Sequence, residues 1–304
     1  MPYKFCTIDA FTDQLFGGAQ ILVLPEATGL TEKQMQKIAS EFNFSETVFI
    51  LPPSSNAFFS KFRIFTPKTE INFAGHPTIA AAFALGYYQP ECFEQGLANF
   101  HVEEKIGPIK ITLHQNKGQI SLTQFTMDKH PILDTYVPPL HELAEILSCK
   151  QSDLILDDYR PMVATCDRPY LVVPILSEEI LRDAHFQLSA WINSSATATL
   201  VPELFLFTTT NTKKDQPTYS ARLLGQHILP TEDPPIGSAL PAFTGYLYLN
   251  SHITDGTYQF IAKRGIPNGR HSVLHASVQK KNNSLTKIQI GGQAVLVSEG
   301  TLFL

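Results

Sequence analysis

Glu46 is the residue whose type and position point most directly to chemistry. It precedes the apolar run 47–50, which is rich in strand-forming residues and predicts a buried strand. A carboxylate at the start of such a strand must be paired, neutralised or chemically engaged, unless it lies on a solvated edge. Removal from water raises the pKa of a carboxyl group, to roughly 6–7 in tuned sites. Glu46 is therefore our candidate for a working acid/base, and a solvated surface glutamate is the alternative.

Two stretches, 73–83 and 233–243, resemble each other. Each has a glycine followed by an apolar, helix-like run, and Pro77 suits the first turn of the first helix because that turn needs no N–H from it. The free N–H groups and the positive dipole end of such a helix form an anion site. A strand-like segment with an arginine precedes each stretch, and we expect Arg63 and Arg222 to be structural.

These two stretches supply five further candidate site residues. His76 and Asp233 would hold amine or hydroxyl groups of a substrate and relay protons. The N–H groups around Gly75, Gly237 and Ser238 would bind a substrate carboxylate or stabilise an oxyanion. Structural roles stay open: a histidine bonded to backbone at a helix start, an aspartate in a turn before proline, and a serine that caps a helix.

The elements that must position these residues form two similar halves. Strand-like segments outnumber helices, and each half offers one long apolar helix about half a chain from the other. The boundary falls near residue 117, in a predicted hairpin turn at 116–118. We therefore predict an α+β fold of two similar domains, 1–117 and 118–304, each with a mixed, mostly antiparallel sheet wrapped around a central helix.

Composition excludes several classes of function. The 304 residues carry a net charge of −5 without a Lys/Arg cluster, which argues against nucleic-acid binding. The four cysteines have no CxxC or zinc spacing, and neither glycine stretch matches a P-loop or dinucleotide fingerprint. We expect the start of the chain to form a strand rather than a signal peptide, and no apolar run reaches about 18 residues. We expect a cytoplasmic protein that needs neither a metal nor an organic cofactor.

Several blocks, in this order and at this spacing, resemble the PhzF-like (phenazine-biosynthesis-like) family, which has the diaminopimelate-epimerase fold. The resemblance covers nearly the whole chain. The blocks are IDAFT (8–12), MQKIASEFNFSETVFI (35–50), FRIFTP (62–67), FAGHPTIAAA (73–82), RPYLVV (168–173), EDPPIGSA (232–239), GR (269–270) and GGQAVLVSEGTL (291–302).

The resemblance implies two like domains with an active-site cleft between them, and a homodimer is plausible on the same ground. Glu46 matches the family's catalytic glutamate. Gly75 and His76 match the glycine and histidine of its GHP motif. The aspartate, glycine and serine of its second motif match Asp233, Gly237 and Ser238.

The sequence departs from the family pattern at positions that line or shape the pocket. The usual GNP reads Gly-Gly-Ala at 17–19, the Ala-Thr before GSA reads Pro-Ile at 235–236, the Phe-x-Pro after the second arginine reads Leu-Leu-Gly at 223–225, and GRP reads Gly-Arg-His at 269–271. Epimerases of this fold place a cysteine before each helix glycine, where this chain has Ala74 and Ile236. A two-thiol racemase is therefore disfavoured.

The resemblance, together with these residues, implies a cofactor-independent isomerase that moves a proton within a small carboxylated substrate, similar to trans-2,3-dihydro-3-hydroxyanthranilate isomerase. Glu46, His76 and Asp233 would be catalytic, and Gly75, Gly237 and Ser238 would bind the substrate. One alternative is epimerisation or β-elimination by the same base. Another is a binding or scaffold protein that keeps the fold without turnover.

Overall fold

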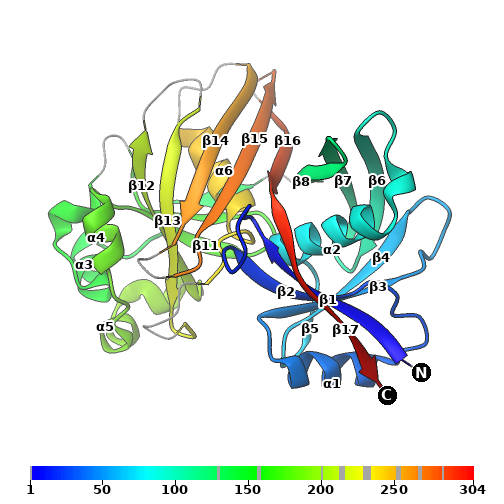
Figure 1. Cartoon of the computed structure of the whole chain (residues 1–304). Coiled ribbons are helices and arrows are strands. Elements are labelled where there is room, and N and C mark those ends of the chain that lie inside the picture. The colour runs from blue at the N-terminus through cyan, green and yellow to red at the C-terminus, as the bar shows by residue number, and fades with distance from the viewer. Residues whose placement is uncertain are drawn as a thin grey trace. The chain divides into compact units, whose positions relative to one another are not determined.

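The computed structural model describes residues 2–128, 131–155, 159–199, 201–211, 216–228, 234–250, 255–265, 269–282 and 284–304 (Figure 1). The chain divides into two compact units. Unit 1 comprises Met1–Met127, Arg270–Leu274 and Gln289–Leu304, and unit 2 comprises Asp128–Gly269 and His275–Ile288.

Unit 1 is a mixed sheet around one long helix. Its elements along the chain are β1 (Pro2–Ala10), β2 (Ala19–Leu24), α1 (Glu32–Phe42), β3 (Glu46–Leu51), β4 (Ser60–Phe65), β5 (Glu70–Ile71), α2 (Gly75–Tyr88), β6 (Leu97–Glu104), β7 (Gly107–Asn116) and β8 (Gln119–Met127), and β17 (Ala294–Phe303) joins them from the end of the chain. Most pairs are antiparallel, namely β17–β1–β2, β3–β4–β5 and β6–β7–β8. The parallel pairs are β2–β3 and β4–β6.

The central helix of unit 1 is α2, and its sequence explains its position. Its residues from Gly75 to Gly86 are all buried, and apart from His76 and Thr78 near its start they are apolar on every side of the helix. A helix without a polar face is stable only when the protein surrounds it. It contacts strands β1, β2, β3, β7 and β8, and Figure 1 shows it running alongside the sheet. By contrast, α1 buries one stripe, Met35, Ile38 and Ala39.

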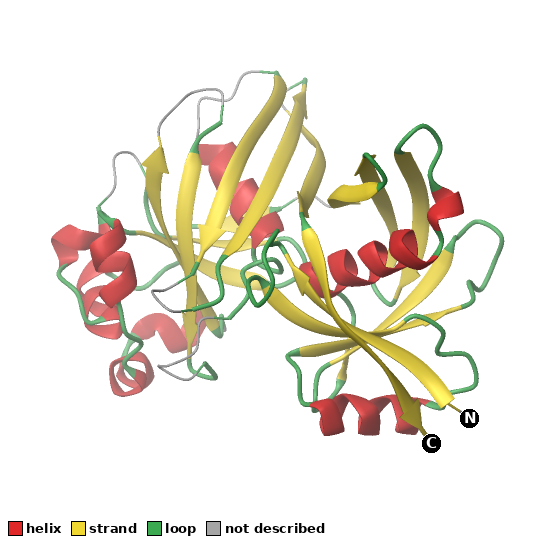
Figure 2. Cartoon of the chain, viewed as in Figure 1, coloured by secondary structure: helices red, strands yellow, loops and turns green. Residues whose placement is uncertain are grey.

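Unit 2 repeats this plan with more helices at its periphery (Figure 2). Its elements are β9 (Ile132–Asp134), α3 (Leu140–Leu147), β10 (Met162–Thr165), β11 (Pro169–Pro174), α4 (Glu178–Asp183), α5 (Leu188–Asn193), β12 (Glu203–Asn211), β13 (Thr218–Gly225), α6 (Leu240–Asn250) and β14 (Gly256–Arg264). Strands β15 (Ser272–Lys281) and β16 (Ser284–Gly292) contribute residues to both units. The pairs β9–β10–β11 and β12–β13 are antiparallel, whereas β11–β12 and β13–β14 are parallel. The apolar helix α6 packs on β9, β10 and β11.

The compact units differ from the predicted domains, 1–117 and 118–304, in two respects: unit 1 extends to Met127, and the later segments 270–274 and 289–304 also belong to it. The predicted turn exists, with Lys117 and Gly118 at positive φ, but its hairpin keeps β8 paired with β7 in unit 1. The last strand, β17, pairs with β1, so the chain returns to unit 1 at its end. Both differences arise from strand pairing, which a linear sequence does not display. Of the described residues, none forms a helix long and apolar enough to cross a membrane.

Candidate active site

Glu46 is the first residue of β3, as the sequence indicated. Its neighbour across the parallel pair with β2 is Ile21, and the strand beyond it is buried from Thr47 to Ile50. The Glu46 side chain is 13% exposed, so the surface alternative does not describe it. One carboxylate oxygen, Oε2, lies 2.6 Å from Nε2 of His76. This is the short distance typical of a hydrogen bond in which one partner is charged.

His76 is the second residue of α2, and its imidazole is 5% exposed. Nε2 faces Glu46, while Nδ1 is buried and makes no hydrogen bond with any described residue. A buried polar atom without a partner costs about 1–3 kcal/mol. Nδ1 is therefore a place where a polar group of a bound molecule would be stabilised. The alternative of a histidine bonded only to backbone does not hold, because its ring contacts Glu46.

The N-terminus of α2 carries no side-chain cap. The capping position is Ala74, whose methyl group accepts no hydrogen bond, and the first turn has no acidic residue. The third helical residue, Pro77, has no N–H to offer. The amide groups of Gly75 and His76 therefore stand at the positive end of the helix dipole, beside the Glu46–His76 pair, where an anion would be stabilised.

The second glycine stretch lies in unit 2, and it differs from the first. Gly237 and Ser238 occupy a turn, and α6 begins only at Leu240, so these two residues do not open the helix as Gly75 and His76 do. The predicted catalytic Asp233 lies outside the described residues. The roles of these three residues in substrate binding and catalysis stay predictions.

Ser238 has a partner that the sequence did not single out. The hydroxyl of Tyr170 donates to Oγ of Ser238 at 3.1 Å. Burial raises the pKa of Tyr170 to about 12, so this hydroxyl keeps its proton and serves as a donor. Oγ of Ser238 is the acceptor of this bond, so the proton of the Ser238 hydroxyl is not used in it. The only sequence signal was the RPYLVV block, in which the tyrosine side chain had no assigned role.

The IDAFT block and Arg270 of the GR block meet in unit 1. Arg270 forms an ion pair with Asp9 and donates to the carbonyl oxygens of Gly17 (2.5 Å) and Gly18 (3.1 Å). Asp9 is 1% exposed and also accepts from the Phe16 amide at 2.7 Å. Burial raises the pKa of Asp9, while Arg270 opposes this shift. The pair fixes the loop after β1.

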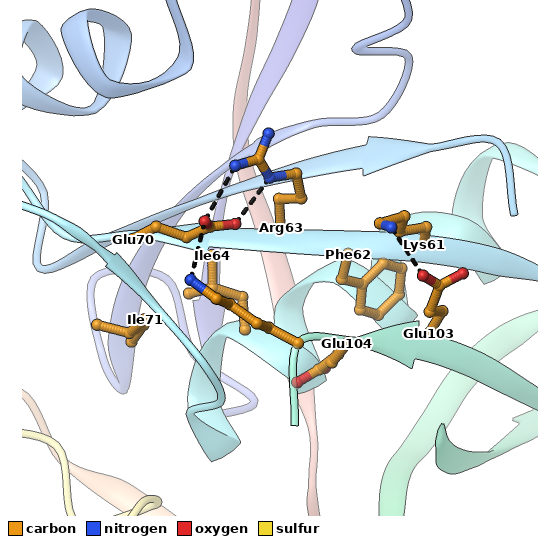
Figure 3. A pocket seen from close by; sticks show the side chains of 9 residues that line it. Lys61, Phe62, Arg63, Ile64, Glu70, Ile71, Glu103 and Glu104 are labelled. Atoms are coloured by element: carbon orange, nitrogen blue, oxygen red, sulfur yellow. Dashed lines mark hydrogen bonds and ion pairs between the residues drawn. The ribbon is translucent and has the colours of Figure 1, made fainter. Parts of the chain in front are cut away.

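The two arginines that the sequence predicts to be structural, Arg63 and Arg222, also have partners. Arg63 binds Glu70 with Nε and Nη2 at 2.7 and 3.0 Å (Figure 3), and Nη2 also reaches Glu32. Arg222 is 7% exposed and donates to the Leu181, Arg182 and Ala184 carbonyls at the end of α4. Each therefore holds local structure. Within the described ranges no three His, Cys, Asp or Glu side chains are grouped as metal ligands would be.

Comparisons with known proteins agree with this fold. The model of the family described as phenazine biosynthesis-like protein, PhzC-PhzF, matches residues 8–300. An uncharacterized isomerase, mll1393, from Mesorhizobium japonicum is 30% identical, and the match covers 99% of both chains. The trans-2,3-dihydro-3-hydroxyanthranilate isomerase of Pseudomonas chlororaphis is 28% identical over 99% of this chain and 100% of that protein.

Among solved structures, the PhzF-family phenazine biosynthesis protein of Bacillus anthracis has a TM-score of 0.84, with 22% identity and full coverage of both chains. This likeness confirms the predicted fold class. Both sequence relatives are named isomerases, which confirms the predicted class of enzyme. Because the family model spans nearly the whole sequence, from residue 8 to residue 300, the chain belongs to the phenazine biosynthesis-like (PhzC-PhzF) family.

Proposed function

We propose that this protein is a cofactor-independent isomerase that moves a proton between two carbons of a small carboxylated molecule, with Glu46 as the acid/base. The relative from Pseudomonas chlororaphis is named for such a reaction, the isomerisation of trans-2,3-dihydro-3-hydroxyanthranilate. The observation that carries the proposal is the 2.6 Å contact between Glu46 and His76 beside the uncapped start of α2.

Each group of this cluster has a distinct part in the reaction. The Glu46 carboxylate takes a proton from one carbon, the electron pair of the broken C–H bond shifts through the adjoining double bond, and Glu46 returns the proton to the second carbon. No atom is gained or lost, so the product is an isomer. Positioned proton transfer of this kind contributes about 10²–10⁴ in rate.

His76 and the helix start hold the reacting molecule. Through Nε2 the imidazole orients the Glu46 carboxyl group, and through Nδ1 it meets a polar group of the substrate. The amides of Gly75 and His76 bind the substrate carboxylate or the charge that develops as the proton leaves. Asp233, Gly237 and Ser238 are proposed to contribute further substrate contacts, on the ground of the family motif that they match.

The substitution Glu46→Gln tests the role of the base, because it keeps the shape of the side chain and removes its basicity. We expect deuterium incorporation from D₂O into trans-2,3-dihydro-3-hydroxyanthranilate to fall by about 10²-fold or more. Affinity for this molecule, measured by calorimetry, should stay within about tenfold, or 1.4 kcal/mol. The control is Glu41→Gln, an exposed glutamate on α1.

Unchanged exchange in Glu46→Gln would overturn the assignment of the base. Binding by the wild-type protein without exchange would favour the non-catalytic alternative. The two-thiol epimerase mechanism has no support here, because the position before Gly75 is Ala74 and carries no thiol.

A further inference from the structure

Ser238 is held by a tyrosine from another part of unit 2. Tyr170 is the second residue of β11, where it pairs with Ala164 of β10, and it is 1% exposed. Its hydroxyl donates to Oγ of Ser238 at 3.1 Å. Strand β11 also contacts α6, the helix that begins two residues after Ser238. The serine of the second motif is therefore anchored to the sheet through one buried hydroxyl group.

The ring of Tyr170 is itself held in place. The guanidinium group of Arg168 lies over the ring, 5.9 Å from its centre, and Arg168 forms an ion pair with Glu203 at 2.9 Å. Glu203 is the first residue of β12, which is parallel to β11. Because the ring is buried and covered in this way, its hydroxyl has a fixed position and can fix Oγ of Ser238 with the precision that a substrate contact needs.

The number of protons in this pair decides what Ser238 can offer. A tyrosine hydroxyl has one proton, and so does a serine hydroxyl. Tyr170 uses its proton toward Ser238, and burial keeps that proton in place by raising the pKa of Tyr170 to about 12. One lone pair of the serine oxygen is thus occupied, while the serine proton is available to an acceptor. Ser238 is thereby arranged as a hydrogen-bond donor.

The alternative role of Ser238, a helix cap, does not fit the local geometry. The residue directly before the first helical residue of α6 is Ala239, whose carbonyl accepts from the Phe243 amide at 3.0 Å. A capping side chain belongs at that position. The Ser238 side chain is half-buried, so it is open to a bound molecule.

We propose that Tyr170 is a positioning residue that makes Ser238 a hydrogen-bond donor to the bound substrate. The group that Ser238 meets must then be an acceptor, and a carboxylate oxygen gives the strongest bond of this kind. The pair therefore favours small carboxylic acids over molecules that present an amine at this point. The effect on isomerisation rests on the proposed function, whereas the hydrogen bond between Tyr170 and Ser238 does not.

The first experiment needs no substrate and tests the hydrogen bond. The C–O stretching band of a tyrosine changes its position with the bond that its hydroxyl makes. The infrared difference spectrum between wild type and Tyr170→Phe isolates the band of Tyr170. The difference between Ser238→Ala and the double variant isolates the same band without its acceptor, and the band should be shifted. An unshifted band would overturn the proposal.

The second experiment measures exchange into trans-2,3-dihydro-3-hydroxyanthranilate. Tyr170→Phe keeps the ring but removes the hydroxyl that fixes Ser238. We expect KM to rise by about fivefold and kcat to stay within about twofold, because the lost contact is made to the bound substrate as well as to the transition state.

The matched control is Tyr219→Phe. Tyr219 is a tyrosine of unit 2 that is 2% exposed, and its hydroxyl meets those of Tyr159 and Tyr258 at 3.4 and 3.2 Å. This variant loses a buried hydroxyl as Tyr170→Phe does, but its KM should equal that of wild type. An equal rise of KM in both variants would indicate a general loss of packing and would overturn the positioning role.

A double-mutant cycle tests whether Tyr170 acts through Ser238. Ser238→Ala should raise KM by about tenfold, and the addition of Tyr170→Phe should raise it no further. Independent effects of the two substitutions would contradict the proposal. If the wild-type protein binds 3-hydroxyanthranilate in calorimetry without catalysing exchange, the proposed function fails, and the same cycle in Kd decides the role of Tyr170. Absence of binding by the wild-type protein would overturn the donor role toward a carboxylate.

Discussion

Two helices of unit 1 begin in opposite ways. The N-terminus of α1 is exposed and has a complete capping box, in which Thr31 accepts from the Gln34 amide at 3.3 Å and the Gln34 side chain accepts from the Thr31 amide at 3.0 Å. An acidic residue, Glu32, adds a favourable charge in the first turn. The N-terminus of α2 is buried, and its capping residue is Ala74, without a side-chain hydrogen bond.

The difference shows that the N-terminus of α2 lacks the stabilisation that a side-chain cap gives to α1. Replacing a capping Ser or Thr by Ala costs about 0.5–2 kcal/mol. At α2 the fold tolerates such a deficit because the whole helix from Gly75 to Gly86 is buried. The amides that a cap would satisfy are left beside Glu46 and His76. We interpret α1 as a helix that is stabilised at its start and α2 as one whose start is kept available for a ligand.

The largest expected effect comes from His76→Asn, which keeps α2 but removes the imidazole from its start. Glu46 loses the partner that orients it, and the substrate loses Nδ1. Deuterium exchange into trans-2,3-dihydro-3-hydroxyanthranilate should fall by about 10²–10⁴. His101→Asn, at an exposed position on β6, is the control and should exchange like wild type. Equal rates in both variants would contradict the role of His76.

A smaller effect should follow when α2 is given the cap that it lacks. In Ala74→Ser the new hydroxyl accepts from an amide of the first turn, which should stabilise the protein by up to about 1 kcal/mol in denaturant unfolding. The same bond competes with the substrate carboxylate, so KM should rise by about fivefold. A higher stability with unchanged KM would show that these amides do not bind substrate.

Sequence reasoning succeeded where the signal is local. The strand after Glu46 and the helix that begins at Gly75 both follow from neighbouring residues, and the structure has both of them. The order of the motifs identified the family over nearly the whole chain. The contact between Glu46 and His76 was predicted only as shared membership of a site, not as a hydrogen bond.

Contacts between distant segments were beyond sequence reasoning. Thr78 donates to Glu104, which is 26 residues away and belongs to no common motif, so nothing linked a strand end to a helix turn. The pair of Asp9 and Arg270, 261 residues apart, depends on how the end of the chain returns to unit 1. The pairing of β8 with β7 keeps unit 1 continuous to Met127, past the predicted boundary at residue 117. In each case the deciding information is strand pairing, which depends on the whole chain.

The smallest effect on activity is expected at the start of α1. Thr31→Ala removes the cap from an exposed helix end and should lower the free energy of unfolding by about 1 kcal/mol, with a fall in Tm of about 2–4 °C. Activity should not change, because no candidate site residue contacts this cap.

Gln34→Ala should lower the free energy of unfolding by a similar amount. The double variant should lose less stability than the sum of the two single losses, because both side chains form one capping box. A loss of activity in Thr31→Ala would mean that the N-termini of α1 and α2 are coupled. The interpretation that α1 has a stabilised N-terminus and α2 one that is available to a ligand would then be wrong.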